Sequence, residues 1–212
     1  MLEIALERKS YDATLLCDIH LTISPGDRLA LVGPSGSGKT TLLNIIGGLD
    51  RAFSGQRRLA DPEPGIAYMF QEPRLLPWRT VMENLRLVCA DRSLVLDLLD
   101  EVGLLDAANR YPRELSLGMA RRVALARALA LEPDLLLLDE PLVSLDPATA
   151  ERMLGLVHRL LERRPRMALV MVSHDLADAA RIGARVHQID PQSGQVLLPS
   201  EEKSASAGQL LV

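Results

Sequence analysis

The chain has few of the features that mark secreted or metal-binding proteins. Among its 212 residues there are only two cysteines, Cys17 and Cys89, which lie far apart and outside any metal-binding spacing. Both have apolar neighbours, so we expect a reduced, buried pair in a cytosolic protein. The sequence begins MLEI and passes directly into an alternating pattern, so we expect no signal peptide.

Two further absences concern membranes and nucleic acids. No apolar run approaches the ~20 residues that a helix needs to cross a bilayer, so any connection with a membrane must run through a partner. The net charge is −4 and the basic residues form no block, which argues against nucleic acid as a partner. The hydrophobic share of 48% and the charged share of 25% are ordinary for a globular protein. The length allows one large domain, or one domain with an inserted lobe.

Residues 33–40 read GPSGSGKT and fit the pattern G-x-x-x-x-G-K-[ST] of a phosphate-binding loop, or P-loop. Residues 27–32 before it predict a short buried strand, and residues 41–46 after it predict an apolar helix. A glycine-rich turn between such elements lets backbone N–H groups converge on one anion. A flexible glycine turn ahead of Lys and Thr is the alternative. The flanking elements favour a nucleoside triphosphate site, with Lys39 on the β- and γ-phosphates and Thr40 on Mg²⁺.

The rest of the chain alternates between predicted strands and helices, which indicates a doubly wound, mostly parallel α/β sheet. Further strands are predicted at residues 2–6, 15–23, 65–70, 134–138, 167–172 and 185–189, and further helices after Thr80, where Glu83 completes a capping box, and at 93–102, 116–129, 147–164 and 176–182. The first two strands belong either to an edge of the main sheet or to a separate small sheet. Residues 52–63 contain Gly and Pro and predict turns. The helices between residues 72 and 132 predict an inserted lobe, and the tail 199–212 is expected to be disordered.

Polar side chains follow three of the predicted buried strands. Asp139 and Glu140 end the apolar run 135–138, and the carboxyl ends of such strands are where ligands bind in an open α/β sheet. Asp139 is suited to holding Mg²⁺ through its water shell, and Glu140 to polarising an attacking water. Gln71 and His174 follow two other strands and belong to the same edge, where Gln71 can orient water and His174 can bond the γ-phosphate. Each of these residues has an ordinary alternative as a solvated strand-end or loop residue.

Together these features resemble the ATP-binding-cassette (ABC) family of ATPases over roughly residues 1–198. In that family a P-loop, a loop glutamine, a signature sequence, a Walker B strand, a D-loop and a switch histidine follow one another. Here the same order is presented by residues 33–40, Gln71, 115–119, 138–140, 144–146 and His174. The resemblance implies one ABC ATPase domain, residues 1–212, that uses ATP and Mg²⁺. Its implied fold is that of a P-loop NTPase with a mostly parallel core sheet, an N-terminal antiparallel β subdomain and an inserted α-helical subdomain.

The resemblance also assigns roles to single residues. ATP would be bound by Tyr11, Gly33, Pro34, Ser35, Gly36, Ser37, Gly38, Lys39, Thr40 and Thr41, and by Ser116, Gly118 and Asp146 of the motifs that complete the site. Mg²⁺ would be held by Thr40, Gln71 and Asp139. Catalysis would rest on Glu140, His174, Gln71 and Lys39. Tyr11 would stack on adenine, although an ordinary strand-end aromatic is the alternative reading of that residue.

The signature departs from the usual family pattern LSGGQ. Residues 115–119 read LSLGM, with Leu117 in place of the first glycine and Met119 in place of the glutamine. Ser116 and Gly118, which are retained, would face the γ-phosphate bound on a second subunit, together with the positive end of the following helix. Met in the last position is found among some importer ATPases of the family. The bulk of Leu117 is expected to crowd the approach of the partner's nucleotide.

The resemblance implies several partners. Two copies would pack head to tail as a homodimer around ATP. The loop 70–78, FQEPRLLPW, is similar to that of bacterial importers for nitrate, sulfonates, taurine and related solutes. This loop would contact a membrane permease through the region from Gln71 to Trp78, with Leu76 among the contacts, unless Leu76 and Trp78 pack within the helical lobe. A solute-binding protein would act indirectly, and the subunit would sit at the cytoplasmic face of the inner membrane.

Three other functions are compatible with parts of the pattern. A non-transport ABC ATPase would act as a nucleotide-gated clamp on a membrane complex. A small-molecule kinase would share the P-loop but gives no reason for Gln71, Ser116 and His174 to occur together. A degenerate structural subunit is suggested by Leu117 alone, and the intact Lys39 counts against it.

Overall fold

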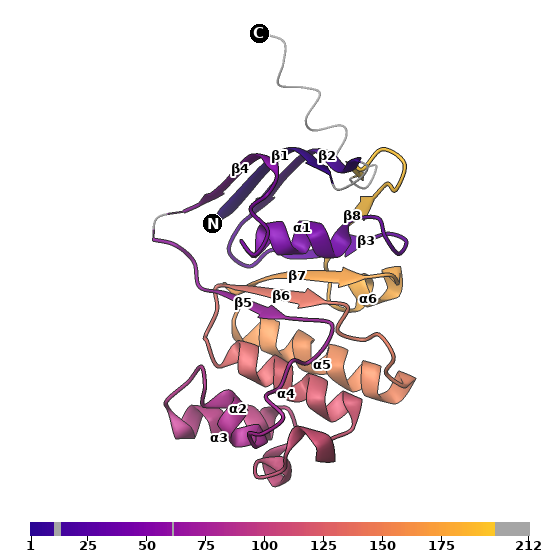
Figure 1. The fold of residues 1–212 in the computed structure, drawn as a ribbon. Helices are drawn as coiled ribbons and strands as arrows, with labels where there is room; N and C mark the ends of the chain where they lie inside the picture. Colours follow the sequence, from indigo (N-terminus) through magenta and orange to yellow (C-terminus); the bar gives the residue numbers. More distant parts are fainter. Residues whose placement is uncertain (11–13, 61, 198–212) are drawn as a thin grey trace.

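The structure, a computed structural model, describes residues 1–10, 14–60 and 62–197 and contains two β-sheets with helix α1 between them (Figure 1). The larger sheet is covered on its other face by α4 and α5, and α2 and α3 lie beyond α4. Tyr11 and the tail for which disorder is predicted lie outside the described residues. No helix in the described ranges is long and apolar enough to cross a bilayer.

The small sheet consists of β1 (Leu2–Ser10), β2 (Thr14–Ile23) and β4 (Ser54–Leu59), in the order β2-β1-β4 and antiparallel throughout. Leu2, Ile4 and Leu6 of β1 point inward, because successive strand residues face opposite sides of a sheet. They pack with α1 and with one face of the larger sheet into a single core. The prediction of an N-terminal antiparallel subdomain is confirmed, and of its two proposed placements the separate sheet is the correct one.

The third strand of this sheet was predicted wrongly, since residues 52–63 were expected to form turns. Strand β4 reads SGQRRL and carries neither an apolar run nor an alternation of apolar and polar residues. Its place depends on pairing with β1, and a Cβ atom at Gly55 would lie 2.1 Å from the carbonyl oxygen of Ala5. Strand β4 is therefore held by a close approach of two backbones, which the strand propensity of its residues does not predict.

The larger sheet follows the order β5-β6-β7-β3-β8-β9. Its strands are β3 (Arg28–Val32), β5 (Ile66–Met69), β6 (Leu135–Asp139), β7 (Ala168–Ser173), β8 (Arg185–Ile189) and the unpredicted two-residue β9 (Val196–Leu197). All neighbouring pairs are parallel except β8 with β9. Every residue of β6 and β7 is buried, as expected for strands covered on both faces. The loops that follow β3, β5, β6 and β7 therefore leave the sheet at one common edge.

Helices pack on both faces of this sheet. On one face lies α1 (Lys39–Ile46), which begins two residues earlier than predicted. The opposite core contains α4 (Leu117–Leu129) and α5 (Pro147–Arg163), with α2 (Val81–Leu85) and α3 (Arg92–Glu101) packed against α4. The short α6 (Leu176–Arg181) packs near β3, β7 and β8, and 3₁₀ turns occupy Leu105–Ala107 and Pro112–Glu114. The mixed α/β class of a P-loop NTPase is confirmed.

Two sequence signals for helix starts are borne out in atomic detail. Glu83 N donates to Thr80 Oγ1 at 3.2 Å and Thr80 N donates to Glu83 Oε2 at 2.8 Å, which completes the capping box of α2. Asp146 caps α5 by accepting from Thr149 N at 3.0 Å, with Pro147 in the first turn. The cysteine prediction is partly wrong. Cys17 and Cys89 are free thiols but only half-buried: Cys17 lies on β2, an outer strand of the small sheet, and Cys89 lies in the loop between α2 and α3.

Asn84 holds the loop between β5 and α2 in place. Its side chain is fully buried, accepts from Leu76 N at 2.8 Å and donates to the carbonyl oxygens of Leu76, Arg79 and Thr80 at 3.0–3.2 Å. One amide therefore satisfies four backbone groups in a segment without regular structure. Replacing it leaves Leu76 N and Arg79 O without this partner, whereas the carbonyl oxygens of Leu76 and Thr80 keep backbone donors, and unpaired buried polar atoms are costly.

We predict that Asn84→Ala lowers the free energy of unfolding by about 2–3 kcal/mol, because buried backbone groups lose their partners. Urea denaturation followed by circular dichroism measures this loss. Asn109→Ala is the matched control, since Asn109 is exposed at the end of a 3₁₀ turn and is expected to change stability by less than about 0.5 kcal/mol. Equal effects of the two substitutions would contradict the anchoring role of Asn84.

Candidate functional site

The P-loop connects the end of β3 to the start of α1. Gly33 in this loop has an extended backbone, and Gly36 and Gly38 have left-handed backbones. Gly36 and Gly38 have φ angles of 79° and 97°, a region that favours glycine. A Cβ atom at Gly33 would lie 2.8 Å from Ser37 Oγ and 3.0 Å from a backbone oxygen of β8. The Oγ atom of Ser37 is buried and has no hydrogen-bond partner among the described residues. The turn is thus tightly wound, with an unpaired polar atom inside it, as expected of a cradle for an anion.

Lys39 is the charged group of this turn. Its side chain is only 5% exposed, and Nζ donates to the carbonyl oxygens of Gly33 and Pro34, both at 2.8 Å. The ammonium group is therefore folded over the loop that the sequence assigns to phosphates. An ammonium group at this position supplies the positive charge that a triphosphate requires.

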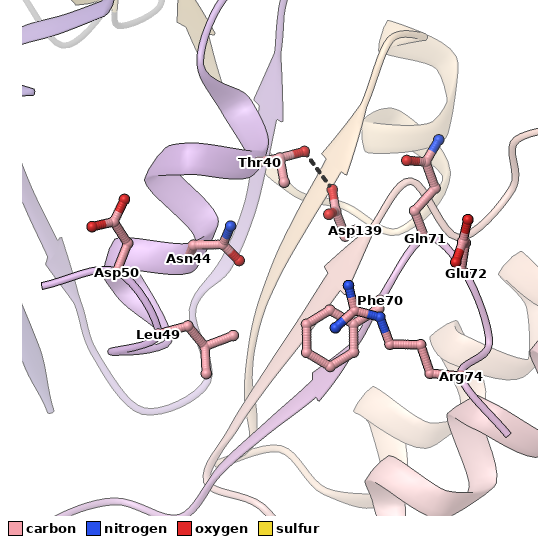
Figure 2. A pocket seen from close by; sticks show the side chains of 9 residues that line it. All are labelled: Thr40, Asn44, Leu49, Asp50, Phe70, Gln71, Glu72, Arg74 and Asp139. Carbon is pink, nitrogen blue, oxygen red and sulfur yellow. Dashed lines mark hydrogen bonds between the residues drawn. The ribbon is translucent and has the colours of Figure 1, made fainter. Parts of the chain in front are cut away.

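Thr40 and Asp139 join the P-loop to the end of β6. The Thr40 hydroxyl donates to Asp139 Oδ1 at 3.0 Å, a bond that Figure 2 shows as a dashed line. Burial raises the pKa of the Asp139 carboxyl, and the neighbouring charge of Glu140 raises it further, whereas the bond from Thr40 and the charge of Lys39 act against the rise. A cation at this position would favour the ionised form of the carboxyl.

Gln71 and Glu140 come from two neighbouring strand ends and meet at the same edge. Gln71 Nε2 donates to Glu140 Oε2 at 3.1 Å. Glu140 has a φ angle of 45°, which is uncommon for a residue with a side chain, and its N–H donates to Val172 O of β7 at 3.2 Å. Such backbone conformations persist where the surroundings enforce them, and they cluster at functional sites.

These groups line one cleft of about 390 Å³. Its walls are Leu15, Ser35, Gly36, Gly38, Lys39, Thr40, Thr41, Gln71 and Glu140. The structure therefore brings together the P-loop, the strand-end glutamine and the strand-end glutamate, although they are distant in the sequence. The arrangement offers donors for phosphate oxygens on one wall and a carboxylate on the other.

A second cleft of about 450 Å³ adjoins the first and shares Thr40 and Gln71 with it. Its lining is drawn in Figure 2: Thr40, Asn44, Leu49, Asp50, Phe70, Gln71, Glu72, Arg74 and Asp139. The Arg74 guanidinium lies 3.9 Å from the centre of the Phe70 ring, in a cation–π contact. Three carboxylates and one guanidinium thus border this second cleft, which we call the groove, beside the P-loop helix.

Seven residues assigned from the sequence line neither cleft: Gly33, Pro34 and Ser37 of the P-loop, and four residues of the other motifs. Ser116 is exposed and caps α4 by accepting from Met119 N at 3.2 Å, and Gly118 is buried against the side chain of Thr149. Asp146 is exposed, and its bonds to Thr149 lower the pKa of its carboxyl. His174 is exposed in the loop after β7. The remaining assigned nucleotide contact, at position 11, lies outside the described residues.

Arg121 is a residue of the site region that the sequence reasoning missed. It lies on α4 with a side chain only 3% exposed, and its guanidinium donates to the carbonyl oxygens of Pro141 and Val143 in the loop after Glu140. Burial lowers the pKa of this guanidinium, and the charge of Glu140 acts against that shift. The sequence did contain a pattern that indicates burial of Arg121, because Gly118, Arg121 and Leu125 are spaced to share one face of a helix.

The donor set around Thr40 suits Mg²⁺. Hydroxyl, amide and carboxylate oxygens from Thr40, Gln71 and Asp139 are the ligands that this hard cation accepts. No cluster of three or more His, Cys, Asp or Glu side chains that could cage a metal occurs among residues 1–10, 14–60 and 62–197.

The sequence matches known proteins over most of its length. A sequence model of the ABC transporter family matches residues 16–143. A protein of Burkholderia lata named aliphatic sulfonates import ATP-binding protein SsuB 2 is 43% identical over 206 residues, which cover 92% of this chain and 75% of the relative. The like-named SsuB of Zymomonas mobilis is 41% identical, with 94% and 85% covered.

Solved structures agree with the sequence comparisons. The dimeric structure of MJ0796, a bacterial ABC transporter cassette, superposes with a TM-score of 0.80 at 33% identity, covering 92% of this chain and 96% of that one. A post-hydrolysis state of MJ0796 bound to ADP and Pi superposes with a TM-score of 0.79 at 32% identity. With the P-loop, Gln71 and Glu140 assembled in one cleft, the chain belongs to the ABC transporter family, as an ATP-hydrolysing subunit of a bacterial importer.

Proposed function

We propose that two copies of the chain close around ATP and Mg²⁺, and that hydrolysis drives the uptake of aliphatic sulfonates through a membrane permease. The observation that carries the catalytic part is the cleft in which Lys39, Gln71 and Glu140 meet. The bond of 3.1 Å between Gln71 and Glu140 ties the amide to the carboxylate that would act on water. The sulfonate assignment is supported by the names of the relatives.

In this proposal the P-loop side of the cleft binds the triphosphate. Backbone N–H groups of residues 33–40 and the ammonium of Lys39 neutralise phosphate charge, while Thr40, Gln71 and Asp139 hold Mg²⁺. When bound, Mg²⁺ would neutralise part of the charge of the triphosphate. The hydrogen bond from Thr40 to Asp139 places a hydroxyl and a carboxylate on adjoining sides of that position.

Glu140 acts on the attacking water as general base in this mechanism, and Gln71 positions it. The carboxylate lines the cleft directly after β6, and a base there would take a proton as the oxygen attacks the γ-phosphate. His174 leaves β7 at the same edge, and we assign it to a hydrogen bond with the γ-phosphate. Its exposed position leaves it accessible to a bound nucleotide.

The rest of the site would come from a second copy. Ser116 and Asp146 are exposed, and Ser116 stands at the N-terminus of α4, where the helix dipole and free N–H groups attract an anion. Gly118 follows in the same turn. Leu117 has 45% of its surface exposed on this segment, so its bulk projects where the partner's nucleotide would approach. The dimeric assembly of MJ0796 supports such a pairing.

The contact with the permease is assigned to the segment from Gln71 to Trp78. The Trp78 side chain is 69% exposed, so it does not pack within the helical lobe, whereas Leu76 is half-buried. A large exposed aromatic is the kind of residue that anchors protein interfaces. This contact would hold the subunit at the cytoplasmic face of the inner membrane, with a solute-binding protein acting on the far side.

We predict that Glu140→Gln keeps ATP binding and dimerisation but loses at least about 100-fold in hydrolysis, because an amide cannot take a proton from water. Phosphate release measures turnover, and size-exclusion chromatography with ATP measures dimerisation. Glu132→Gln is the matched control, since Glu132 is exposed at the far end of α4 and touches neither cleft. Wild-type turnover of Glu140→Gln would remove this residue from the role of base.

We predict that Trp78→Ala weakens binding to the permease about thirtyfold, corresponding to about 2 kcal/mol for an aromatic anchor, without changing ATP affinity. Co-purification with the permease subunit from the same host and ATP titration of the isolated subunit are the two measurements. Leu131→Ala, at a side chain 50% exposed on another part of the surface, is the control. Equal binding of both variants would show that Trp78 is not a contact.

Uptake of sulfonates is tested in the host cell. We expect a deletion strain to grow normally with inorganic sulfate but to fail with an alkanesulfonate as sole sulfur source, because the ATPase powers only its own permease. A plasmid with the wild-type gene restores growth, and one with the Glu140→Gln variant does not. Normal growth of the deletion strain on several alkanesulfonates would refute the substrate class while leaving the ATPase assignment intact.

A further inference from the structure

Arg121 is a buried cation without a carboxylate partner. Its side chain on α4 is 3% exposed, and none of the ion pairs formed among residues 1–10, 14–60 and 62–197 includes it. Its Nε atom is also buried and has no hydrogen-bond partner in that part of the chain. Burying a charge without an ion pair is costly, so the contacts that the guanidinium does make must offset this cost.

Those contacts are made with the loop that follows Glu140. Nη1 of Arg121 donates to the carbonyl oxygen of Pro141 at 3.2 Å and also to that of Val143. Within the described part of the chain, no backbone N–H bonds either of these two oxygens. Arg121 is therefore the group that satisfies both carbonyls, and it reaches them from a helix that is distant in the sequence.

The backbone of this loop is strained at both ends. Glu140 and Ser144 have φ angles of 45° and 61°, in the left-handed region that residues with side chains seldom adopt. The backbone bond inside the turn, from Val143 N to Glu140 O, is 3.3 Å long and thus weak. Two such residues five positions apart persist only where the surroundings enforce them. The carbonyls that Arg121 bonds lie between the two, so its guanidinium acts where this enforcement is needed.

The placement of the Glu140 carboxylate depends on the same loop. On the side of the sheet, Glu140 N donates to Val172 O at 3.2 Å and Gln71 Nε2 donates to the carboxylate at 3.1 Å. On the other side, the chain leaves Glu140 through the loop alone. If the loop relaxes, the φ angle of Glu140 can return to the ordinary range, which turns its side chain relative to the P-loop. A catalytic group must be held to within about 0.5 Å of its productive position.

We propose that Arg121 is a positioning residue for Glu140, whose guanidinium locks the loop 140–144 in the conformation that directs the carboxylate into the cleft. The inference rests on the proposed role of Glu140 as general base. Arg121 lines neither cleft, so in this scheme it touches neither nucleotide nor water and acts only through the loop. Losing the guanidinium therefore slows hydrolysis and leaves nucleotide binding by the P-loop unchanged.

The test compares two substitutions of Arg121. Arg121→Met keeps an unbranched apolar stem and removes every donor. We expect its kcat for ATP hydrolysis to fall about 10- to 100-fold, the range for a misplaced catalytic group, with KM within about twofold of the wild type. Arg121→Lys keeps one charged donor that can bond a carbonyl oxygen, and its kcat should fall only about two- to fivefold. Phosphate release measures both constants, and calorimetric titration with the non-hydrolysable analogue AMPPNP measures nucleotide affinity.

Arg122→Met is the matched control, because Arg122 is the next residue of the same helix and donates to Val102 O of the helical lobe at 2.7 Å instead of to the loop. We expect its kcat to stay within about twofold of the wild type. Thermal unfolding midpoints show whether the variants fold. Should Arg121→Met fail to fold, the comparison of Arg121→Lys with Arg122→Lys decides in the same way.

Equal kcat values for the Arg121 and Arg122 variants, or a loss of kcat matched by a loss of AMPPNP affinity, would overturn the positioning role. In the Glu140→Gln background, Arg121→Met should cause no further loss of hydrolysis, because both changes remove the same step; additive losses would show that Arg121 acts elsewhere. Wild-type turnover of Glu140→Gln alone would refute the proposed base, and that result comes from a chain in which Arg121 is intact.

Discussion

The hydrogen bond from Thr40 to Asp139 connects two parts of the chain on which the whole site depends. Thr40 lies in the first turn of α1, and Asp139 ends β6. In the sheet, however, β7 lies between β6 and β3, the strand that leads into α1. The P-loop helix must therefore cross over β7 for its first turn to reach the Walker B carboxylate, and α1 does contact both strands. The site is determined by the position of one helix on the sheet, more than by any single loop.

The position of α1 is fixed by apolar packing on two sides. Leu42, Leu43, Ile45 and Ile46 are fully buried between the small sheet and the larger one, in a core that both sheets share. Burial of four such side chains contributes on the order of 6–12 kcal/mol of favourable transfer free energy. The antiparallel sheet thus serves the site although it supplies few of its groups, because it closes the second face of the helix that carries Lys39 and Thr40.

The sequence predicted the elements whose pattern lies within one short segment, and it did not predict those that depend on a distant segment. The strands β6 and β7 are continuous apolar runs and the P-loop has fixed spacing, so the core sheet and the residues at its edge could be predicted. Strand β4 could not, because its polar sequence is held by pairing with β1. The bond of 2.9 Å from the Tyr68 hydroxyl on β5 to Asn44 Oδ1 on α1 was missed for a similar reason, since the two residues share no sequence pattern.

The two clefts share a wall, and this limits how a partner in the groove can affect catalysis. Thr40 and Gln71 line both clefts, so a group that enters the groove meets two residues that also line the proposed nucleotide cleft. Gln71 bonds the carboxylate of Glu140, whose backbone has a conformation that its neighbours must enforce. A shift of Gln71 would therefore change the placement of the proposed base directly. One side chain, that of Gln71, is enough to connect a partner bound in the groove with Glu140 in the other cleft.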